Sequence, residues 1–309
     1  MKRVRDRYRG GLTMGLRRIA TCAMLCVLAV WLVAAGCGGG GTGGRAITVE
    51  GPVELNRSFE EGASFKYLFK VTGESAVAMQ GYDRVVSTNT EFRTSNTVTS
   101  VTDDEVKLEM RFDSAASSIS MEDNVMPNEG VAELRGKSLE FTLDRDGKVI
   151  SFAGLGGSRY LEEGAGEMGM LLYSLYPTLP DEPVSVGYTW EEDIDIPDIT
   201  SSVDREFIGT GTYTVIGYKE KYGIACVEVA TTSTFIFEGK AEQSGDIWLM
   251  SGEGTSEGVI LISMDNGMVL AGVSDTTLDL EGEGSTTAGA GASTTVSMGM
   301  KIHSEMELL

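Results

Sequence analysis

The sequence predicts a mostly β protein built on one or more large antiparallel sheets. Gly accounts for 40 of the 309 residues and Pro for only 6. Thr and Ser are frequent in the middle and C-terminal thirds, and this composition suits strands and turns better than long helices. Several segments also alternate between apolar and polar residues, which is the period of a strand with one buried face. A chain of this length can form one large β domain or two smaller ones.

The negative charge is concentrated after the first 36 residues. Of the 25 basic residues seven lie in 1–36, whereas only one of the 46 acidic residues does. The remainder, 37–309, therefore has a net charge of −27. Such a surface repels phosphate backbones and anionic lipid headgroups, so we expect no nucleic-acid partner. Solubility is the first interpretation of this charge, and binding of divalent cations is the alternative.

Residues 1–36 have the organisation of a signal peptide. Seven basic side chains precede an uncharged apolar run of 17 residues, 19–35, which is short for a membrane-spanning helix. Translation from Met1 or from Met14 would each supply a basic N-terminal region, because Met14 precedes the last basic pair.

The apolar run ends in LVAAGC, where Ala34, Ala35 and Gly36 stand immediately before Cys37. This stretch resembles the lipobox of bacterial lipoproteins, although Ala34 occupies a position where that pattern most often has Leu. The resemblance implies cleavage after Gly36 and attachment of lipid to the Cys37 thiol. Two or more acyl chains anchor a protein stably, so we expect an extracytoplasmic protein held on a membrane surface by lipid. An uncleaved N-terminal anchor is the alternative, with the domain on the same side of the membrane.

Residues 37–60 are expected to be the lipidated cysteine and a Gly-rich tether, because 38–44 offers almost no side chains for packing. The β-rich domain then spans 61–309. Cys226 is the single cysteine within that domain, which excludes an intramolecular disulfide there. Its strand-like neighbours include no His, so we interpret it as a half-buried, inert thiol rather than a nucleophile.

Period-two alternation is clearest in four segments, each of which is predicted to be a strand with one face in the core and one in water. In Glu105–Asp113 every second residue is apolar and the others are charged. The apolar positions predicted to face a core are Phe65, Tyr67, Phe69, Val71, Val106, Leu108, Met110, Phe112, Leu139, Phe141, Leu143, Val296, Met298, Met300 and Ile302.

Two Gly-containing dipeptides predict hairpins. Asp146-Gly147 and Asn266-Gly267 each separate two apolar segments, and both are favoured two-residue turns. A long Thr-rich β stretch precedes each of them. One interpretation is a duplicated unit, with halves 61–155 and 187–309 that form a curved sheet or half-barrel.

The segment 156–186 between these halves is expected to hold a helix and a Pro-rich connector. Its Leu and Met residues have helical spacing up to Tyr176, and Pro177 ends the pattern. We expect one short helix near 159–176 that packs across the sheet. A lid over a cavity is the alternative.

The connector that follows reads LYPTLPDEPVSVGYTW, from Leu175 to Trp190. Its prolines predict an extended chain, Gly187 a turn, and Trp190 the start of the next strand. The stretch resembles the pattern aromatic-Pro-x-Leu-Pro followed by Pro-Val-x-Val-Gly-x-x-Trp in an uncharacterised family of β-rich bacterial lipoproteins. That resemblance would cover about residues 60–309, rests on this stretch, and implies no activity, because none is known for the family.

Few residues point to catalysis or metal binding. The single histidine, His303, falls on the polar side of its predicted strand, so the sequence indicates neither a Ser-His-Asp arrangement nor a zinc site. Glu191, Asp193 and Asp195 share one strand face and could bind a hard cation, but a solvated face is the first interpretation. The segment 144–147 lacks the distal ligands of a calcium loop. We predict no catalytic residue, no metal ligand and no cofactor.

Three function classes follow from these patterns, in order of preference. The first is a non-enzymatic structural or interaction module of the cell envelope, whose protein partners the sequence does not specify. The second is a carrier of lipid or another hydrophobic ligand. A curved antiparallel sheet with an apolar concave face, crossed by a helix, is similar to lipoprotein-carrier and mycobacterial-type lipid-binding half-barrels. An enzyme comes third, since it would need a pocket built from carboxylates alone.

Overall fold

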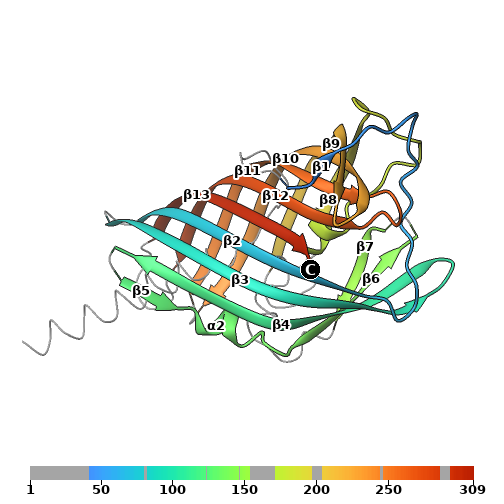
Figure 1. The fold of residues 1–309 in the computed structure, drawn as a ribbon. Helices are drawn as coiled ribbons and strands as arrows, with labels where there is room; N and C mark the ends of the chain where they lie inside the picture. The colour runs from blue at the N-terminus through green and yellow to red at the C-terminus, as the bar shows by residue number, and fades with distance from the viewer. Residues whose placement is uncertain are drawn as a thin grey trace, which may run out of the picture.

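The strands of this protein form one 13-stranded antiparallel sheet (Figure 1). The computed structural model describes residues 42–79, 82–122, 124–145, 147–153, 171–196, 204–243, 246–285 and 293–309. The strands are β1 Arg45–Ala46, β2 Ser64–Met79, β3 Tyr82–Val101, β4 Glu105–Met121, β5 Asn124–Pro127, β6 Ser138–Asp144, β7 Val149–Ala153, β8 Thr189–Ile196, β9 Asp204–Lys221, β10 Ile224–Gln243, β11 Asp246–Ser263, β12 Val269–Ser285 and β13 Ser293–Leu308.

The strand order confirms the mostly β, antiparallel prediction and shows how the two expected halves are joined. The order is β1-β9-β10-β11-β12-β13-β2-β3-β4-β6-β7, with β5 added to β4 and β8 added to β9. Strands β2–β7 and β8–β13 are therefore each contiguous in the sheet, and pairing of β13 with β2 joins them. In the described part of the chain the sheet is not closed, because β7 pairs only with β6 and β8 only with β9.

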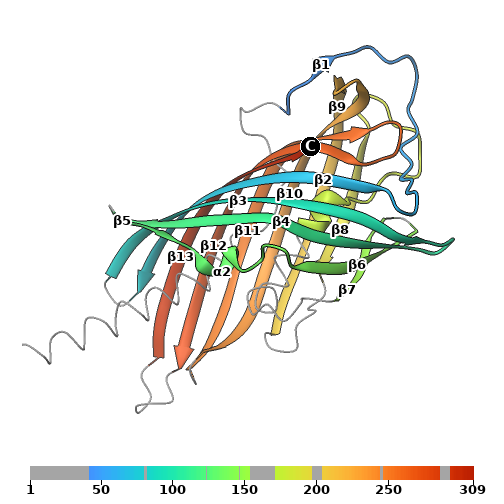
Figure 2. The ribbon, with the colours of Figure 1, turned by 60° about the horizontal axis from the view of Figure 1, so that its bottom comes forward.

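The apolar positions predicted from period two lie on one side of the sheet, here called the inner face. Four of them, one from each predicted strand, are no more than 2% exposed: Tyr67, Leu108, Phe141 and Met298. In both views β2, β3 and β4 cross at an angle to β10–β12 (Figure 1 and Figure 2). Side chains from these two parts of the sheet share one core cluster, so the sheet curves around its inner face.

One end of the inner face is filled by the cluster that we call the packed core. Its strand residues include Leu108 of β4 and Val227 of β10. Segments outside the sheet provide the opposing layer, with Leu55, Leu172 and Tyr176 each 4% exposed or less. A sheet must bury its apolar face against such a second layer, and this end of the molecule satisfies that requirement.

The two predicted hairpins are confirmed, but both have loops longer than two residues. The Asp144 amide donates to the Lys148 carbonyl across a three-residue loop, in which Gly147 has a φ of +87°. The Ser263 amide donates to the Met268 carbonyl across a four-residue loop that contains Gly267 at +66°. Longer hairpin loops also place Gly in the left-handed region, so the dipeptide locates the turn without fixing its length.

The predicted helix is confirmed where the structure describes it. Residues 171–175 are helical, and the helix ends before Pro177 as expected. The remaining predicted part, 159–170, lies outside the described residues. A second helix, α2 Glu129–Ala132, was not predicted, because four residues are too few to show a helical period.

The N-terminal segment packs on the sheet from Thr42 onward, although the sequence analysis assigned it to the tether. The Lys221 Nζ donates to the Thr42 carbonyl at 2.7 Å, β1 pairs with the end of β9, and Leu55 is 4% exposed. Gly44, at a φ of +90°, permits this contact, since an added Cβ would lie 2.9 Å from the Glu220 carbonyl oxygen. Absence of side chains here allows close approach as well as flexibility.

Within the described ranges, no helix has the length and apolar character needed to cross a membrane. The expected signal peptide, its cleavage residues and the lipidation site Cys37 all lie outside those ranges. Their assignment remains a prediction.

Candidate functional site

The inner face carries a second apolar cluster, farther along the strands than the packed core. We call it the second cluster. Its buried members are Val71, Ile194, Phe207, Phe235, Phe237, Leu278, Leu280, Met298, Met300 and Ile302, all of them strand residues. Tyr173, in the helical segment 171–175, is the one described residue from outside the sheet that packs against them. In the described structure, this part of the inner face has much less of a second layer than the packed core.

Phe235 in the second cluster lies over glycine positions of the neighbouring strands. A methyl group on Gly254 of β11 would overlap the Phe235 ring, and one on Gly209 of β9 would lie 2.9 Å from the Phe235 Cβ. The ring also stacks on Phe207, with ring centroids 4.7 Å apart. The glycines of these two strands therefore make room for an aromatic pair on the inner face.

Hydroxyl side chains form a belt across the inner face between the packed core and the second cluster. We call Thr231, Ser233, Ser256, Ser274 and Thr276 the hydroxyl belt. They come from β10, β11 and β12, and all are between 0% and 8% exposed. Thr276 Oγ1 donates to Ser256 Oγ at 2.9 Å.

Three members of the belt are buried without a hydrogen-bond partner among the described residues: Thr231, Ser233 and Ser274. Leaving a buried hydroxyl unpaired costs about 1–3 kcal/mol, and native structures contain few such groups. Register places Thr231 and Ser274 on either side of Gly258 of β11, so the two hydroxyls are separated by a position without a side chain. The belt is therefore rich in unused hydrogen-bonding capacity.

A carboxylate lies beside the belt, on the inner face of β8. Glu192 accepts hydrogen bonds from the Thr178 amide at 3.1 Å, from the Thr178 hydroxyl, and from the Tyr213 hydroxyl at 3.3 Å. Burial, followed by the nearby charge of Glu192, raises the pKa of Tyr213. Burial also raises the pKa of Tyr173, whose hydroxyl makes no hydrogen bond of ordinary geometry with a described residue.

Arg57 connects three segments at the side of the packed core. Its Nη2 donates to the Pro177 carbonyl at 2.7 Å and its Nη1 to the Gly147 carbonyl at 3.3 Å. Its guanidinium carbon lies 5.7 Å from the centroid of the Tyr176 ring. Burial lowers the pKa of Arg57 to about 10, so the side chain remains charged at neutral pH. Its contacts are those of a structural cross-link.

The connector has the features that its sequence predicted. Gly187 turns the chain with a φ of +91°, and Trp190 lies at the start of β8. The Trp190 Nε1 donates to the Thr178 carbonyl at 3.1 Å, and its ring stacks on Tyr213 with centroids 5.1 Å apart. The residues on which the family resemblance rests thus hold the connector against the sheet. The resemblance itself remains a prediction.

The acidic segment of β8 divides between the two faces of the sheet. Glu191 and Asp193 are exposed on the outer face, whereas Glu192 faces inward. Of Asp195 the structure describes only the backbone. In the described ranges, no three His, Cys, Asp or Glu side chains are grouped to hold a metal ion.

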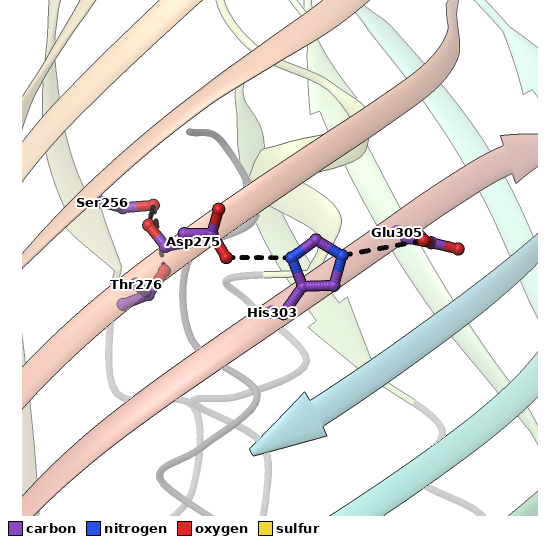
Figure 3. A network of polar contacts seen from close by, with 5 residues as sticks. All are labelled: Ser256, Asp275, Thr276, His303 and Glu305. Carbon is purple, nitrogen blue, oxygen red and sulfur yellow. Dashed lines mark hydrogen bonds and ion pairs between the residues drawn. The ribbon is translucent and has the colours of Figure 1, made fainter. Parts of the chain in front are cut away.

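His303 lies on the outer face, as predicted. Its Nδ1 is 2.9 Å from Asp275 Oδ1 and its Nε2 is 3.7 Å from Glu305 Oε1 (Figure 3). Ser256 and Thr276 appear in the same network, but both are buried inner-face residues. The Ser256 hydroxyl therefore points away from the His303 ring, and the five residues are not arranged as a Ser-His-Asp relay.

Cys226 is fully buried rather than half-buried. It packs with Leu261, Leu270 and Ala271 in a small separate cluster. Burial raises the pKa of the Cys226 thiol to about 11, which disfavours the nucleophilic thiolate. This environment fits the expected inert thiol.

Sequence reasoning missed Glu192 and the hydroxyl belt. Glu192 had a signal, because it interrupts the inward-facing stripe of Trp190 and Ile194. The belt had none, since Thr and Ser occupy both faces of β10, as at Thr231 and Thr232.

No protein-family model and no curated protein matches the sequence. Among solved structures, the chain is similar to lipovitellin in a structure concerned with its lipid–protein interactions, at 9% identity and a TM-score of 0.43 over 82% of this chain. The chain spans only 25% of the lipovitellin chain that it matches. Likenesses this distant do not bear on function.

Two outer membrane proteins are also similar. An outer membrane channel from Pseudomonas putida F1 matches at 8% identity and a TM-score of 0.25, over 82% of this chain and 97% of its own. The outer membrane protein OprD from Pseudomonas aeruginosa matches at 8% identity and a TM-score of 0.21, over 84% and 97% of the two chains. These values are likewise too low to support an argument.

Proposed function

We propose that this protein is a non-enzymatic carrier of an amphipathic, lipid-like molecule on the inner face of its sheet. The observation that carries the proposal is the pair of neighbouring sites described above. Three buried hydroxyls without a described partner adjoin an apolar cluster for which the described chain supplies little opposing surface.

The chemistry of the two sites defines the ligand. The buried members of the second cluster are 1% to 9% exposed, so an acyl chain would have to enter among them. It would gain about 25 cal/mol for each Å² of its own apolar surface removed from water. Serine and threonine hydroxyls both donate and accept hydrogen bonds, so they suit the ester and hydroxyl oxygens of an uncharged head group. The nearby Glu192 carboxylate disfavours an anionic head group.

The lipid anchor is the second part of the proposal. Acylation at Cys37 would hold the protein on a membrane surface outside the cytoplasm, as the lipobox resemblance implies. We expect Cys37→Ser to give an unacylated precursor that still bears its signal peptide, because lipidation of the thiol precedes cleavage. Detergent-phase partitioning measures this. A mutant that enters the detergent phase at the processed size would refute the anchor.

Ligand binding is tested with a fluorescent monoacylglycerol and a matched pair of isosteric variants. Thr231→Val removes an unpaired inner hydroxyl, and Thr232→Val removes an exposed hydroxyl from the next position of β10. We expect Thr231→Val to bind the probe about fivefold more weakly without any loss of thermal stability, since a buried unpaired hydroxyl does not stabilise the fold. The control should bind normally.

Two outcomes would contradict the carrier. One is the absence of saturable binding, together with a mass of the native protein that shows no copurified lipid. The other is an equal loss of affinity in both variants, which would place the probe away from the hydroxyl belt.

A further inference from the structure

The outer face has a groove of its own, on the side of the sheet opposite the proposed carrier site. It crosses β8 to β12 and has a volume of about 1050 Å³. Ile208 and Ile236, paired across β9 and β10, are 49% and 59% exposed within it. Exposed apolar side chains that adjoin one another in a concave surface mark interaction sites more often than single, scattered ones do.

The shape of the groove follows the strand register. Thr210, Thr234, Thr255 and Thr277 are direct cross-strand neighbours on β9 to β12 and form one row of its lining. Adjacent strands lie about 4.8 Å apart, so the five strands from β8 to β12 span about 19 Å. That length corresponds to roughly 13 residues of α-helix at 1.5 Å per residue.

All the charged side chains that line the groove are negative. Asp193, Glu253 and Asp279 line it, and among its lining residues there is no Lys, Arg or His. The nearest basic position in the register is Lys301, which pairs with Thr277 beyond the end of the groove. Like-charged Glu253 and Asp279 are directly opposite each other, an arrangement that destabilises an isolated sheet and that a cationic partner would relieve.

We propose that this groove docks a basic, amphipathic segment of a partner protein. The apolar side of the segment would cover Ile208 and Ile236, and its Lys or Arg side chains would pair with the three carboxylates. An acidic partner is disfavoured by the same charges. Ile194 and Phe235 belong to the second cluster and also line the groove. The inference does not depend on the proposed carrier function, because the apolar and acidic side chains that it uses are exposed on the outer face.

The test uses a fluorescent amphipathic helix of about 14 residues made of Lys and Leu, together with an analogue in which Glu replaces Lys. The full chain is measured by fluorescence anisotropy, in solution or in phosphatidylcholine nanodiscs according to whether it is acylated, with empty nanodiscs as the blank. We expect saturable binding of the Lys peptide and none of the Glu peptide.

Variants then locate the binding. Both Ile236→Ser and the double variant Glu253→Gln, Asp279→Asn should weaken binding by about tenfold, which is about 1.4 kcal/mol. Glu140 is an exposed carboxylate on β6, near the opposite edge of the sheet. Glu140→Gln is the matched control and should bind the peptide normally. All these positions are exposed, so no variant should lower the melting temperature. The double variant should melt slightly higher, because it removes the like-charged pair.

Equal weakening in the control and in the groove variants would show attraction to the net negative charge alone and would overturn the proposal. Loss of affinity in the charge variants but not in Ile236→Ser would overturn the amphipathic mode. Absence of any binding of the Lys peptide at low ionic strength would overturn the whole proposal.

Discussion

Burial alternates so sharply along β4 that adjacent residues differ in their tolerance of a carboxylate. Leu108 is 1% exposed, whereas Lys107 and Arg111 are on the exposed side of the same strand. We expect Leu108→Asp to lose roughly 2–5 kcal/mol of packing and a desolvation penalty in addition, a large part of a typical stability of about 5–15 kcal/mol.

The controls are Lys107→Asp and Arg111→Asp, which should change the free energy of unfolding by no more than about 0.5 kcal/mol. Thermal melts of the three variants measure these effects. Similar losses at all three positions would contradict the inner and outer assignment of β4.

The thiol of Cys226 provides a second probe at this scale. Burial raises its pKa to about 11, and its Sγ lies 3.4 Å from the Ile224 carbonyl oxygen. At pH 8 we expect it to react with an aromatic disulfide reagent at least about a hundredfold more slowly in the native protein than in the unfolded chain, because both access and thiolate fraction are reduced. Fast native labelling at Cys226, identified by peptide mapping, would disprove this burial.

At the scale of elements, the glycines of the strands differ in how much space surrounds them for an added side chain. An added methyl group at Gly254 of β11 would overlap the Phe235 ring and lie 2.9 Å from the Thr277 carbonyl oxygen. At Gly217 of β9 it would meet only Glu228 Oε2, at 3.4 Å. We expect Gly254→Ala to destabilise the protein by about 1–3 kcal/mol through overpacking, and Gly217→Ala to be neutral or slightly stabilising.

Denaturant unfolding of both glycine variants measures the difference. A neutral Gly254→Ala would mean that the Phe235 ring moves freely, which would weaken the description of the second cluster as a fixed surface.

Individual strands were predictable because their signal is local. Alternation over a few residues identified Tyr67, Leu108 and Met298 as buried, and a Gly dipeptide located each hairpin. Loop lengths were not predictable, since Gly147 and Gly267 serve loops of different length equally well. The four-residue helix α2 was missed for the opposite reason, because a single turn has no period.

At the scale of the whole molecule, three buried tyrosines and a partly buried one make stability sensitive to alkali. Burial raises the pKa of Tyr67, Tyr173, Tyr176 and Tyr213 above the ordinary value of 10.0, to about 12 for Tyr176. Above about pH 10 the unfolded chain releases these protons while the folded protein retains them, so their contribution is lost as pH rises. Arg57 opposes this, because its pKa is lowered to about 10, but it is one group against four.

We therefore expect the free energy of unfolding to fall between about pH 10 and 12. Tyrosinate absorbance from the buried rings should appear only together with loss of the β circular dichroism signal. Full ionisation of all tyrosines with the circular dichroism unchanged would contradict the burial of these rings.

Long-range arrangement was beyond the reach of local patterns. Tyr67 near the start of the domain pairs with Leu308 at the C-terminus, and no local period encodes such a partner. The candidate site depends on the same register, which brings Thr231, Ser256 and Ser274 together on neighbouring strands. Local sequence patterns thus predicted buried apolar positions of the candidate site but gave no indication of the buried hydroxyls between them.

The contact between Lys221 and Thr42 restricts how an acylated molecule could stand on its membrane. Thr42 is five residues from Cys37. A fully extended chain covers about 3.3–3.6 Å per residue, so Cys37 can lie at most about 18 Å from Thr42. Ile224 begins β10 at the end of the sheet where Lys221 contacts Thr42. Phe235 of the second cluster lies 11 residues farther along this strand, up to about 36 Å from Ile224.

An upright molecule would therefore present its cargo end away from the bilayer that anchors it. A molecule that lay flat would bring the second cluster close to the bilayer. The net charge of −27 after residue 36 opposes such close approach to anionic headgroups. If the protein is acylated and carries lipid as proposed, lipid that enters an upright molecule would have to come from a donor that faces the end away from the anchor.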